Sequence, residues 1–349
     1  MLFLSYKYFN FVLKFHNMLR YSVIIPIYNR PDEIVELLDS LTLQSQKDEM
    51  EVIIVEDGSN RPCKNDIECY YNELDLNYIY QENAGPGAAR NRGAREATGE
   101  YLIFFDSDCI IPADYIKIID SHLPQENGLD MFGGPDKEHP FFTPIQKAIS
   151  YSMTSFITTG GIRGSKEQMD RFYPRSFNMG IRKSVFEKLN GFADMRFGED
   201  LDLSMRVIEN GFNVGLLYDA SVYHKRRTNF MAFFKQVFNS GIARIDLSLK
   251  HKNTLKPVHF LPSAFTIGYP MLLVLSIFNS AFLYLFIAFP LIIFFDALFK
   301  MKSIKVALLS IIASFVQLTG YGSGFIYAFW KRIIRKKGAF NSFTKNFYG

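Results

Sequence analysis

The chain is organised around the stretch Tyr101-Leu102-Ile103-Phe104-Phe105-Asp106-Ser107-Asp108. Its continuous apolar run predicts a strand that is buried on both faces. Two carboxylates follow where this strand ends, and ligands of open α/β sheets bind at that edge. Ionised acids there either bind a divalent cation or accept hydrogen bonds from a ligand hydroxyl. A solvated acidic turn is the alternative, and the motif alone does not exclude it.

Strands and helices alternate on either side of this stretch. Apolar runs predict further buried strands at Tyr21–Pro26, Val52–Val55 and Asn77–Gln81. The first is followed by a helix that opens near Pro31, because proline is favoured in the first helical turn. Such alternation predicts an α/β domain with a mostly parallel central sheet flanked by helices.

Polar residues follow several of these strands. They are Tyr28 and Asn29 after the first strand, Asp57 after the second, and the pair Asp106 and Asp108. Because parallel strands end at the same edge of a sheet, we expect these side chains to converge there. Asp57 by itself is more often a turn residue before glycine. Together, the residues predict a nucleotide site.

A glycine-rich turn runs from Gly85 to Gly93 and resembles a dinucleotide-binding fingerprint only superficially. The fingerprint requires Gly or Ala five residues after its first glycine, and Arg90 stands there. No Walker lysine–serine pair follows a glycine loop either. The sequence therefore argues against a nicotinamide or flavin cofactor. The small side chains predict a helix packed tightly on the sheet, with Arg90 facing an anionic ligand or, alternatively, solvent.

A second group of acids lies near Gly198-Glu199-Asp200. Leu201, Met205 and Ile208 fall on one helical face, so Asp200 is expected in the first turn of a helix. An acid there complements the helix dipole. The same position also holds a side chain rigidly at a pocket rim, as a general base requires.

His224 follows a further predicted strand and precedes a basic cluster. It is either a metal or phosphate contact or a structural histidine.

Composition narrows the class of protein. The chain has 349 residues, of which 48% are hydrophobic, and a net charge of +4. Its basic residues cluster at 225–227, 250–252, 300–302 and 331–337, beside apolar runs. That pattern favours an anionic membrane surface over nucleic acid. Three cysteines make no disulfide framework and suit a reducing compartment.

The C-terminal third predicts a membrane anchor. Phenylalanines on one face of Phe230–Phe238 predict a helix at the membrane interface, or alternatively a helix packed on the catalytic domain. Leu261–Phe299 is long enough for two spans broken near Asn279. A third apolar segment, Ile304–Trp330, either crosses the membrane or dips in and returns, helped by its glycines. The predicted division is an N-terminal extension (1–20), a catalytic domain (21–228), interface helices (229–260), two to three transmembrane segments (261–330) and a basic tail (331–349).

Five motifs occur in the order seen in family 2 glycosyltransferases of the GT-A fold, and the chain resembles that family over about residues 21–245. The motifs are Ser22-Val23-Ile24-Ile25-Pro26-Ile27-Tyr28-Asn29, Val55-Glu56-Asp57-Gly58-Ser59, Asn83 to Gly93, Asp106-Ser107-Asp108 and Gly198-Glu199-Asp200. The hydrophobic C-terminal segments look like those of membrane-anchored members that build envelope polysaccharides.

The resemblance implies roles for individual residues. Pro26, Tyr28 and Asp57 would hold the nucleotide base, with Tyr28 stacking and Asp57 accepting from a ring N–H. Asp106 would reach the ribose, and Asn29 and Arg90 complete the nucleotide-sugar set. The metal set implied by the family comprises Asp108, Asp106 and His224, around Mg²⁺ or Mn²⁺. Asp200 would deprotonate the acceptor hydroxyl, with Glu199 beside it contacting acceptor or donor sugar.

Elementary chemistry agrees with these roles. Expelling a nucleoside diphosphate needs a cation as Lewis acid, and a sugar hydroxyl needs a positioned carboxylate to become nucleophilic. A single base opposite the leaving group implies inversion. Processive members of the family carry Gln-x-x-Arg-Trp on an interface helix, whereas the only tryptophan here is Trp330.

The sequence therefore predicts transfer of one sugar, with UDP as the commonest nucleotide of the family, to a lipid-linked or glycan acceptor. The predicted place is the cytoplasmic membrane, with the catalytic domain facing the cytoplasm, membrane lipid as a partner and no nucleic acid. Two alternatives remain open. One is a processive polysaccharide synthase with a membrane channel, and the other is an inactive sugar-nucleotide-binding scaffold.

Overall fold

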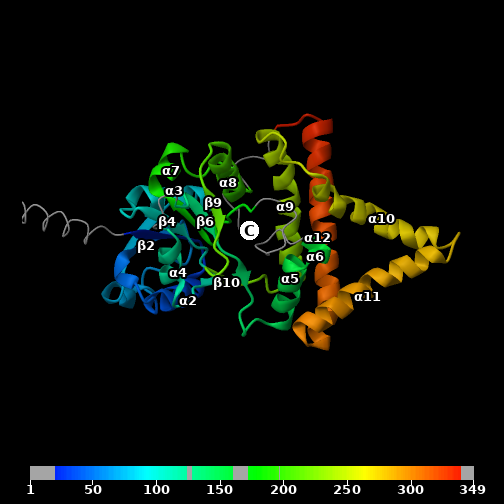
Figure 1. Ribbon diagram of the computed structural model, residues 1–349, viewed down its shortest axis with the longest axis horizontal. Helices are drawn as coiled ribbons and strands as arrows, with labels where there is room; N and C mark the ends of the chain where they lie inside the picture. The colour runs from blue at the N-terminus through cyan, green and yellow to red at the C-terminus, as the bar shows by residue number, and fades with distance from the viewer. Residues whose placement is uncertain (1–19, 124–127, 160–171, 196, 339–349) are drawn as a thin grey trace, which may run out of the picture.

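A computed structural model describes residues 20–123, 128–159, 172–195 and 197–338 (Figure 1). Residues 1–19, which make up nearly all of the expected N-terminal extension, and residues 339–349 of the expected basic tail lie outside the described residues.

The region predicted as the catalytic domain, residues 21–228, is called the catalytic half below. It is built on a mixed sheet of mostly parallel strands, which confirms the predicted α/β class. The strands lie in the order β3 (Asp75–Gln81), β2 (Met50–Asp57), β1 (Tyr21–Ile27), β4 (Tyr101–Phe104), β8 (Met179–Arg182), β6 (Met131–Gly133) and β9 (Val214–Leu216). β1 pairs in parallel with both β2 and β4, so that Ile24 lies between Ile53 and Phe104. Only β8 runs against its neighbours. Parallel strands buried on both faces explain the apolar runs in the sequence.

A second, small sheet brings distant residues to the end of β4. It contains β5 (Cys109–Ile110), β10 (Val222–His224) and β7 (Asp136–Lys137), in that order. In its register His224 lies opposite Cys109, the residue after Asp108. Strands this short leave no periodic signal in the sequence, because period-2 alternation needs about four residues to be recognised.

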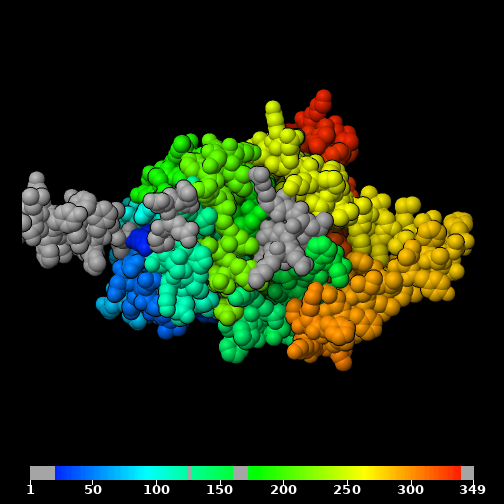
Figure 2. Space-filling view, in the orientation of Figure 1, coloured from blue at the N-terminus to red at the C-terminus, as the bar shows by residue number. Residues whose placement is uncertain are grey.

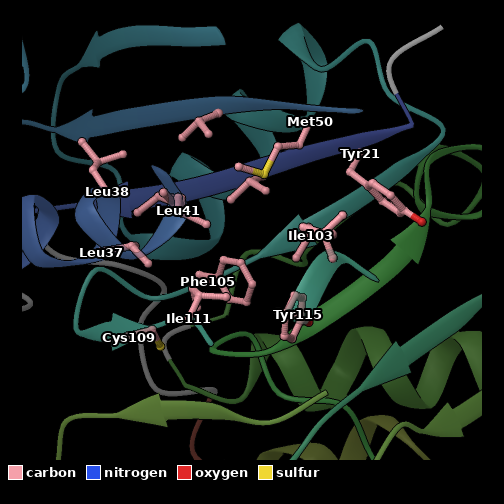
Figure 3. Packing of buried hydrophobic residues seen from close by; sticks show 14 of the residues in the cluster. Tyr21, Leu37, Leu38, Leu41, Met50, Ile103, Phe105, Cys109, Ile111 and Tyr115 are labelled. Carbon is pink, nitrogen blue, oxygen red and sulfur yellow. The ribbon is translucent and has the colours of Figure 1, made fainter. Parts of the chain in front are cut away.

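Helices cover both faces of the main sheet. On one face α2 (Pro31–Thr42) and α4 (Tyr115–His122) bury Leu37, Leu41 and Tyr115 against Ile103 of β4 (Figure 3). On the other face lie α3 (Pro86–Glu96), α7 (Lys183–Lys188) and α8 (Glu199–Glu209). A Cβ added at Gly93 of α3 would lie 2.5 Å from a methyl carbon of Ile24, so the small residues of α3 allow the expected close packing.

A layer of helices lies beside the catalytic half (Figure 1). It contains α5 (Pro144–Thr154), α6 (Phe156–Thr159), α9 (Phe230–Lys250), α10 (Leu261–Leu275), α11 (Ala281–Met301) and α12 (Ile304–Phe329). Short 3₁₀ turns occupy Lys47–Glu49, Glu68–Asn72 and Pro257–Phe260. The segments Pro257–Leu275, Ala281–Met301 and Ile304–Ile334 are long and apolar enough to cross a membrane.

The helical layer differs from its expected outline in two ways. The interface helix expected at Phe230–Phe238 continues to Lys250 as α9. α5, which comes from the middle of the catalytic sequence, also packs in this layer, since Ala148 and Ile149 share a core cluster with Phe233 of α9 and Ala313 of α12. α9 therefore rests on other helices of the layer.

α9 also supports the helix that carries the predicted base. A Cβ added at Gly198, the residue before α8, would lie 3.3 Å from both Ala243 and Leu247 of α9. Asp202 of α8 is fully buried and contacts the C-terminal end of α9, with an oxygen 2.6 Å from Nζ of Lys250 and 2.9 Å from Nε2 of His251. The first turn of α8 is thus held between the sheet and the helical layer.

Candidate nucleotide-sugar site

Asp108 and His224 meet at the end of β4. Nε2 of His224 lies 3.1 Å from Oδ1 of Asp108, although the two residues are far apart in the sequence. The pairing of β5 with β10 creates this proximity. The imidazole also stacks on the ring of Phe177, with centroids 4.7 Å apart, which fixes its orientation.

Asp108 is a buried acid that stays ionised. Burial alone would raise its pKa, but His224 and Arg30 outweigh that effect and hold the pKa well below its ordinary value. NH1 of Arg30 lies 3.1 Å from Oδ2 of Asp108 and 2.9 Å from Glu33. Asp108 is therefore a buried carboxylate that is ionised.

The polar atoms around Asp108 fit a bound divalent cation. Nδ1 of His224 is buried without a hydrogen-bond partner among the described residues, and Oδ1 of Asp108 has only the contact with Nε2 of His224. Buried polar atoms normally have partners, so such atoms at a strand end call for an explanation. Ligand atoms of Asp108, Cys109 and His224 lie within 4.8 Å of one another. A carboxylate suits Mg²⁺ or Mn²⁺, and a histidine nitrogen is a common ligand of transition metals.

Cys109 differs from its two neighbours. Burial raises the pKa of its thiol well above the ordinary value, and the carboxylates of Asp108 and Asp106 add to that effect. Its Sγ lies 3.5 Å from the carbonyl oxygen of Phe177, to which the thiol donates. The thiol is therefore protonated at neutral pH.

Arg90 connects two of the predicted site acids. Its buried guanidinium lies 2.5 Å from Asp106 and 3.2 Å from Glu199. Burial opposes the charge of Arg90, but the two carboxylates raise its pKa above the ordinary value. The alternative of a solvent-facing Arg90 is thereby excluded. Arg90 instead ties the end of β4 to the start of α8.

The first turn of α8 contains the predicted catalytic pair. Burial and the adjacent Asp200 raise the pKa of Glu199, while Arg90 opposes them. Asp200 has little exposure, and its Oδ2 accepts a hydrogen bond from Nε of Arg175 at 2.9 Å. α8 therefore presents Glu199 toward Arg90 and Asp106, and Asp200 toward Arg175.

The carboxylate of Asp57 accepts hydrogen bonds from the end of β3 and the loop that follows it. Its Oδ1 accepts from Nε2 of Gln81 at 2.7 Å and from the amide of Ala84 at 2.9 Å. Its Oδ2 accepts from the amide of Gly85 at 2.8 Å and from Asn83 at 3.3 Å. These four donors fill the usual capacity of a carboxylate. Its role toward a nucleotide base stays a prediction, and it would require one side-chain donor to move.

The remaining predicted nucleotide contacts lie at the same edge. Pro26 and Tyr28 are half-buried at the end of β1. Asn29 has a left-handed φ of 55°, and its side-chain oxygen accepts from the amide of Asn60 at 2.7 Å. Its own amide donates to Ser59 at 2.7 Å. Asn29 thus links the loops after β1 and β2, and its contact with a ligand stays a prediction.

Sequence reasoning missed three arginines. Arg30 and Arg175 contact Asp108 and Asp200, and Arg227 also lowers the pKa of Asp108. Arginine has no characteristic spacing to a carboxylate on another element, so no pattern could have found these pairs. The only available signal was the position of Arg30 directly after the Tyr28-Asn29 motif.

The basic cluster at 225–227 does not form a lipid-facing surface as expected. Lys225 pairs with Glu36 at 2.5 Å, and buried Arg226 pairs with Asp136 at 2.5 Å. These partners lie on α2 and β7 of the catalytic half.

Comparisons with known proteins place this arrangement among sugar-transferring enzymes. Residues 22–189 match the family model described as glycosyl transferase family 2. The chain is 39% identical over 225 residues to the poly(ribitol-phosphate) beta-N-acetylglucosaminyltransferase TarS of Staphylococcus aureus, covering 59% of this chain and 35% of TarS. It is 26% identical over 253 residues to glycosyltransferase AglE of Haloferax volcanii, covering 71% of this chain and 80% of AglE.

The extent of these matches varies. The matched segments span 17%, 18% and 35% of the length of the first curated relatives. Among solved structures, the mannosyltransferase PcManGT from Pyrobaculum calidifontis in complex with GDP-Man and Mn2+ is similar with a TM-score of 0.62 at 17% identity. That similarity covers 85% of this chain and 86% of PcManGT, and it shows a shared fold.

Proposed function

Because the domain formed by residues 22–189 belongs to glycosyl transferase family 2, we propose that this chain is an inverting glycosyltransferase that uses a nucleotide-diphosphate sugar. It transfers one sugar to a lipid-linked or glycan acceptor in the synthesis of cell-envelope polysaccharide or glycoconjugate. It works at the cytoplasmic membrane, with the catalytic domain facing the cytoplasm.

The observation that carries this proposal is the link between two acidic groups through Arg90. Asp106 follows β4 and Glu199 begins α8, and the guanidinium lies within 3.2 Å of both. Asp108 and His224 lie directly beside this link, at the carboxyl edge of the parallel strands. The proposed ion-binding pair, Asp108 and His224, and the candidate base Asp200 thus lie at strand ends and in the first turn of a helix around the same edge of the sheet.

Asp108 and His224, with Asp106 beside them, are the residues that would hold Mg²⁺ or Mn²⁺. When bound, the cation stabilises the charge that develops on the departing diphosphate. Arg30 and Arg227 already act on Asp108 electrostatically. They add fixed positive charge at the place where the diphosphate would bind.

Asp200 is proposed to accept the proton of the acceptor hydroxyl. Its position at the start of α8 keeps the carboxylate rigid, and general-base help of this kind contributes about 10²–10⁴-fold to the rate. In this structure Arg175 holds Asp200 at 2.9 Å. The acceptor must replace or share that contact. Glu199 stays with Arg90 and contacts acceptor or donor sugar.

The helical layer supports a membrane-borne acceptor. α9 packs against Gly198, directly before the catalytic pair, and it also packs along α12. The catalytic turn is therefore separated from the candidate membrane helices by one helix. The name of the relative TarS, a poly(ribitol-phosphate) beta-N-acetylglucosaminyltransferase, fits transfer to a polymeric acceptor. The nucleotide is proposed to be UDP, the commonest in the family.

A screen of nucleotide sugars tests the proposal. The full chain in detergent is incubated with UDP-, GDP- and TDP-sugars, with and without Mn²⁺, and both thermal shift and release of nucleoside diphosphate are measured. We expect one class of donor to stabilise the protein and to be hydrolysed slowly in a metal-dependent way. If no nucleotide sugar binds with or without Mn²⁺, the proposal fails.

The variant Asp200→Asn separates the base from donor binding. We expect turnover to fall by about 10²–10⁴-fold while the thermal shift with donor is retained. Asp219→Asn is the matched control, because Asp219 is exposed and distant in sequence from the motifs. Full turnover by Asp200→Asn would favour a different base, and no turnover by the native chain would favour the scaffold alternative.

The processive alternative is tested by the product. Gly241 and Arg244 lie where processive relatives carry Gln-x-x-Arg-Trp, and Gly241 packs against Tyr321 and Phe325 of α12. We expect a single product after long incubation of purified protein with acceptor. A ladder of products would instead indicate a polymerising synthase.

A further inference from the structure

α12 lies alongside α9 and across the base of the hairpin formed by α10 and α11 (Figure 1). Glycines let α12 and α9 approach closely. A Cβ added at Gly324 would lie 2.0 Å from the carbonyl oxygen of Phe238, and one added at Gly320 would lie 2.5 Å from Val237. A Cβ at Gly241 would lie 2.2 Å from the carbonyl oxygen of Tyr321. One face of α12 is therefore covered by protein.

These glycines do not interrupt the helix. Ile304–Phe329 is continuous, so the glycines serve packing and not a turn back out of the membrane. Polar residues share the buried face of α12, and Ser310 and Ser314 are fully buried. Leu308 and Ile312 are about half exposed on another face. An apolar outer face with a protein-covered inner face fits a helix at the membrane surface and also a helix packed within the membrane, so the position of α12 is decided by what it packs against.

α9 cannot follow α12 into the hydrocarbon core. It carries Lys235, Arg244 and Asp246, and charged side chains are costly at membrane depth. Its other side is attached to α8 through Asp202. If α12 crossed the bilayer upright, α9 and part of the catalytic half would have to enter with it.

α10 and α11 are different, because lipid is their natural surrounding. Only 6% and 11% of their apolar windows are buried, against 39% for the window of α12. The sequence from Leu261 to Phe295 carries no Asp, Glu, Lys or Arg. Figure 2 shows both helices, in yellow to orange, protruding beyond the rest of the molecule. Ile277 and Phe278 at the tip are among the most exposed apolar residues.

Both open ends of the hairpin are held at α12. A Cβ added at Gly322 of α12 would lie 2.4 Å from the carbonyl oxygen of Pro262, near the start of α10. Ile293 and Ala297, toward the end of α11, share a core cluster with Ala307 of α12. The chain thus leaves the catalytic side through α10 and returns to the same side through α11.

We propose that α10 and α11 are the only membrane-inserted helices among the described residues, and that α12 lies along the bilayer surface beside α9. The residues after α12 are then on the same side of the membrane as the catalytic half. Basic residues fit this position: Lys302 and Lys305 lie near one end of α12, and Lys331 and Arg335 near the other. Both ends would face anionic headgroups.

The competing arrangement has three crossings and places the residues after α12 on the opposite side. The two arrangements are distinguished by the number of labels on single molecules. Cys69 is an exposed thiol in the catalytic half, whereas Cys63 and Cys109 are buried. Gly338 lies after α12 with no atom within 4 Å of an added Cβ, so Gly338→Cys fits without strain.

The Gly338→Cys chain, with Cys69 kept, is reconstituted in sealed vesicles containing anionic lipid and treated with a membrane-impermeant maleimide. Intact mass then reports the labels on each molecule. Same-side topology predicts molecules with no label or with two, whatever the mixture of orientations. Three crossings predict molecules with a single label, before detergent is added. That result would overturn the proposal.

Three controls make the count reliable. The native chain in detergent must take up one label, and Cys69→Ser must take up none, which shows that the buried thiols do not react. Cys69→Ser combined with Gly338→Cys must take up one label in detergent. None of these controls depends on transferase activity, so the topology is tested independently of the proposed function.

Discussion

The two strands on either side of β1, β2 and β4, lead to buried acids that behave differently. At the end of β2, Asp57 accepts from four donors, and Glu56 accepts from the amide of Cys63 at 2.8 Å and from Ser59. After β4, Asp108 lies beside Arg30 and His224, and no backbone amide among the described residues is found donating to its carboxylate. Both acids are nearly inaccessible to solvent.

The comparison shows that buried acids at the same edge of a sheet can have different roles. An acid whose lone pairs are filled by backbone amides holds a loop in place, and its loss leaves buried donors unpaired. An acid that is paired with charged side chains and receives no backbone amide keeps coordination sites for a ligand. Both acids are buried aspartates, so only the partners separate the structural acid, Asp57, from Asp108, the acid proposed to bind a metal ion.

The largest expected effect is at the ligand-binding acid. Asp108→Asn should lower metal-dependent turnover by about 10³-fold, because Lewis-acid stabilisation of the leaving group contributes several kcal/mol. The thermal midpoint should change little, since Arg30 keeps Glu33 as a partner. Steady-state kinetics with a Mn²⁺ titration measure the loss. Activity within tenfold of the native chain would place the metal elsewhere.

A smaller effect, on stability and not on turnover, is expected at the end of β2. Asp57→Asn turns one acceptor into a donor that faces the amide of Gly85, which should lower the free energy of unfolding by about 1–3 kcal/mol. Chemical denaturation in detergent measures it. Asp75→Asn, at the exposed start of β3, is the control. Unchanged stability would show that the four hydrogen bonds at Asp57 are dispensable.

Removing one donor of Asp57 sharpens the comparison. Gln81→Ala should lower the free energy of unfolding by about 0.5–1.5 kcal/mol and leave one lone pair of Asp57 open. If Asp57 accepts from the nucleotide base, affinity for the donor sugar should hold or improve, as calorimetric titration would measure. A large fall in affinity would mean that Gln81 itself contacts the nucleotide.

The last expected effect is on the pH dependence of stability and concerns Asp202, a buried acid paired with Arg206, Lys250 and His251. Burial alone would raise its pKa, but Lys250, His251 and Arg206 outweigh it and leave the pKa below the ordinary value. Its stabilising contribution is therefore present above the unfolded pKa of about 3.9 and is lost as pH falls through the lowered pKa.

The native chain should accordingly lose its thermal advantage over Asp202→Asn only below about pH 4. Melting curves of both proteins from pH 6 to pH 3 measure this loss. A constant advantage at every pH would contradict an ionic role for Asp202.

Much of this protein followed from sequence. The apolar runs at β1, β2 and β4 predicted parallel strands correctly, since burial on both faces excludes polar residues over the whole strand. Asp106 and Asp108 were placed at the sheet edge by the same reasoning. The predicted first turn of α8 also agrees with the structure, because Leu201 and Met205 show helical spacing and are buried.

The contacts between these residues could not be derived from residue patterns in the sequence. That His224 meets Asp108 was implied only by the family resemblance, and no residue pattern indicates that Arg90 joins Asp106 to Glu199 or that Arg175 holds Asp200. Each pair joins different elements, and its contact depends on strand register and helix position. Asp57 shows the same limit, because its motif is compatible with a turn or with a ligand contact until its donors are known.

The membrane anchor divides in the same way. Sequence alone determined that three apolar segments of sufficient length follow the catalytic half, because length and hydropathy are local properties of the chain. Only the tertiary structure decided that α12 has one face against α9 while α10 and α11 stand clear. Packing between helices depends on which faces meet, and that is set by the fold of the whole chain.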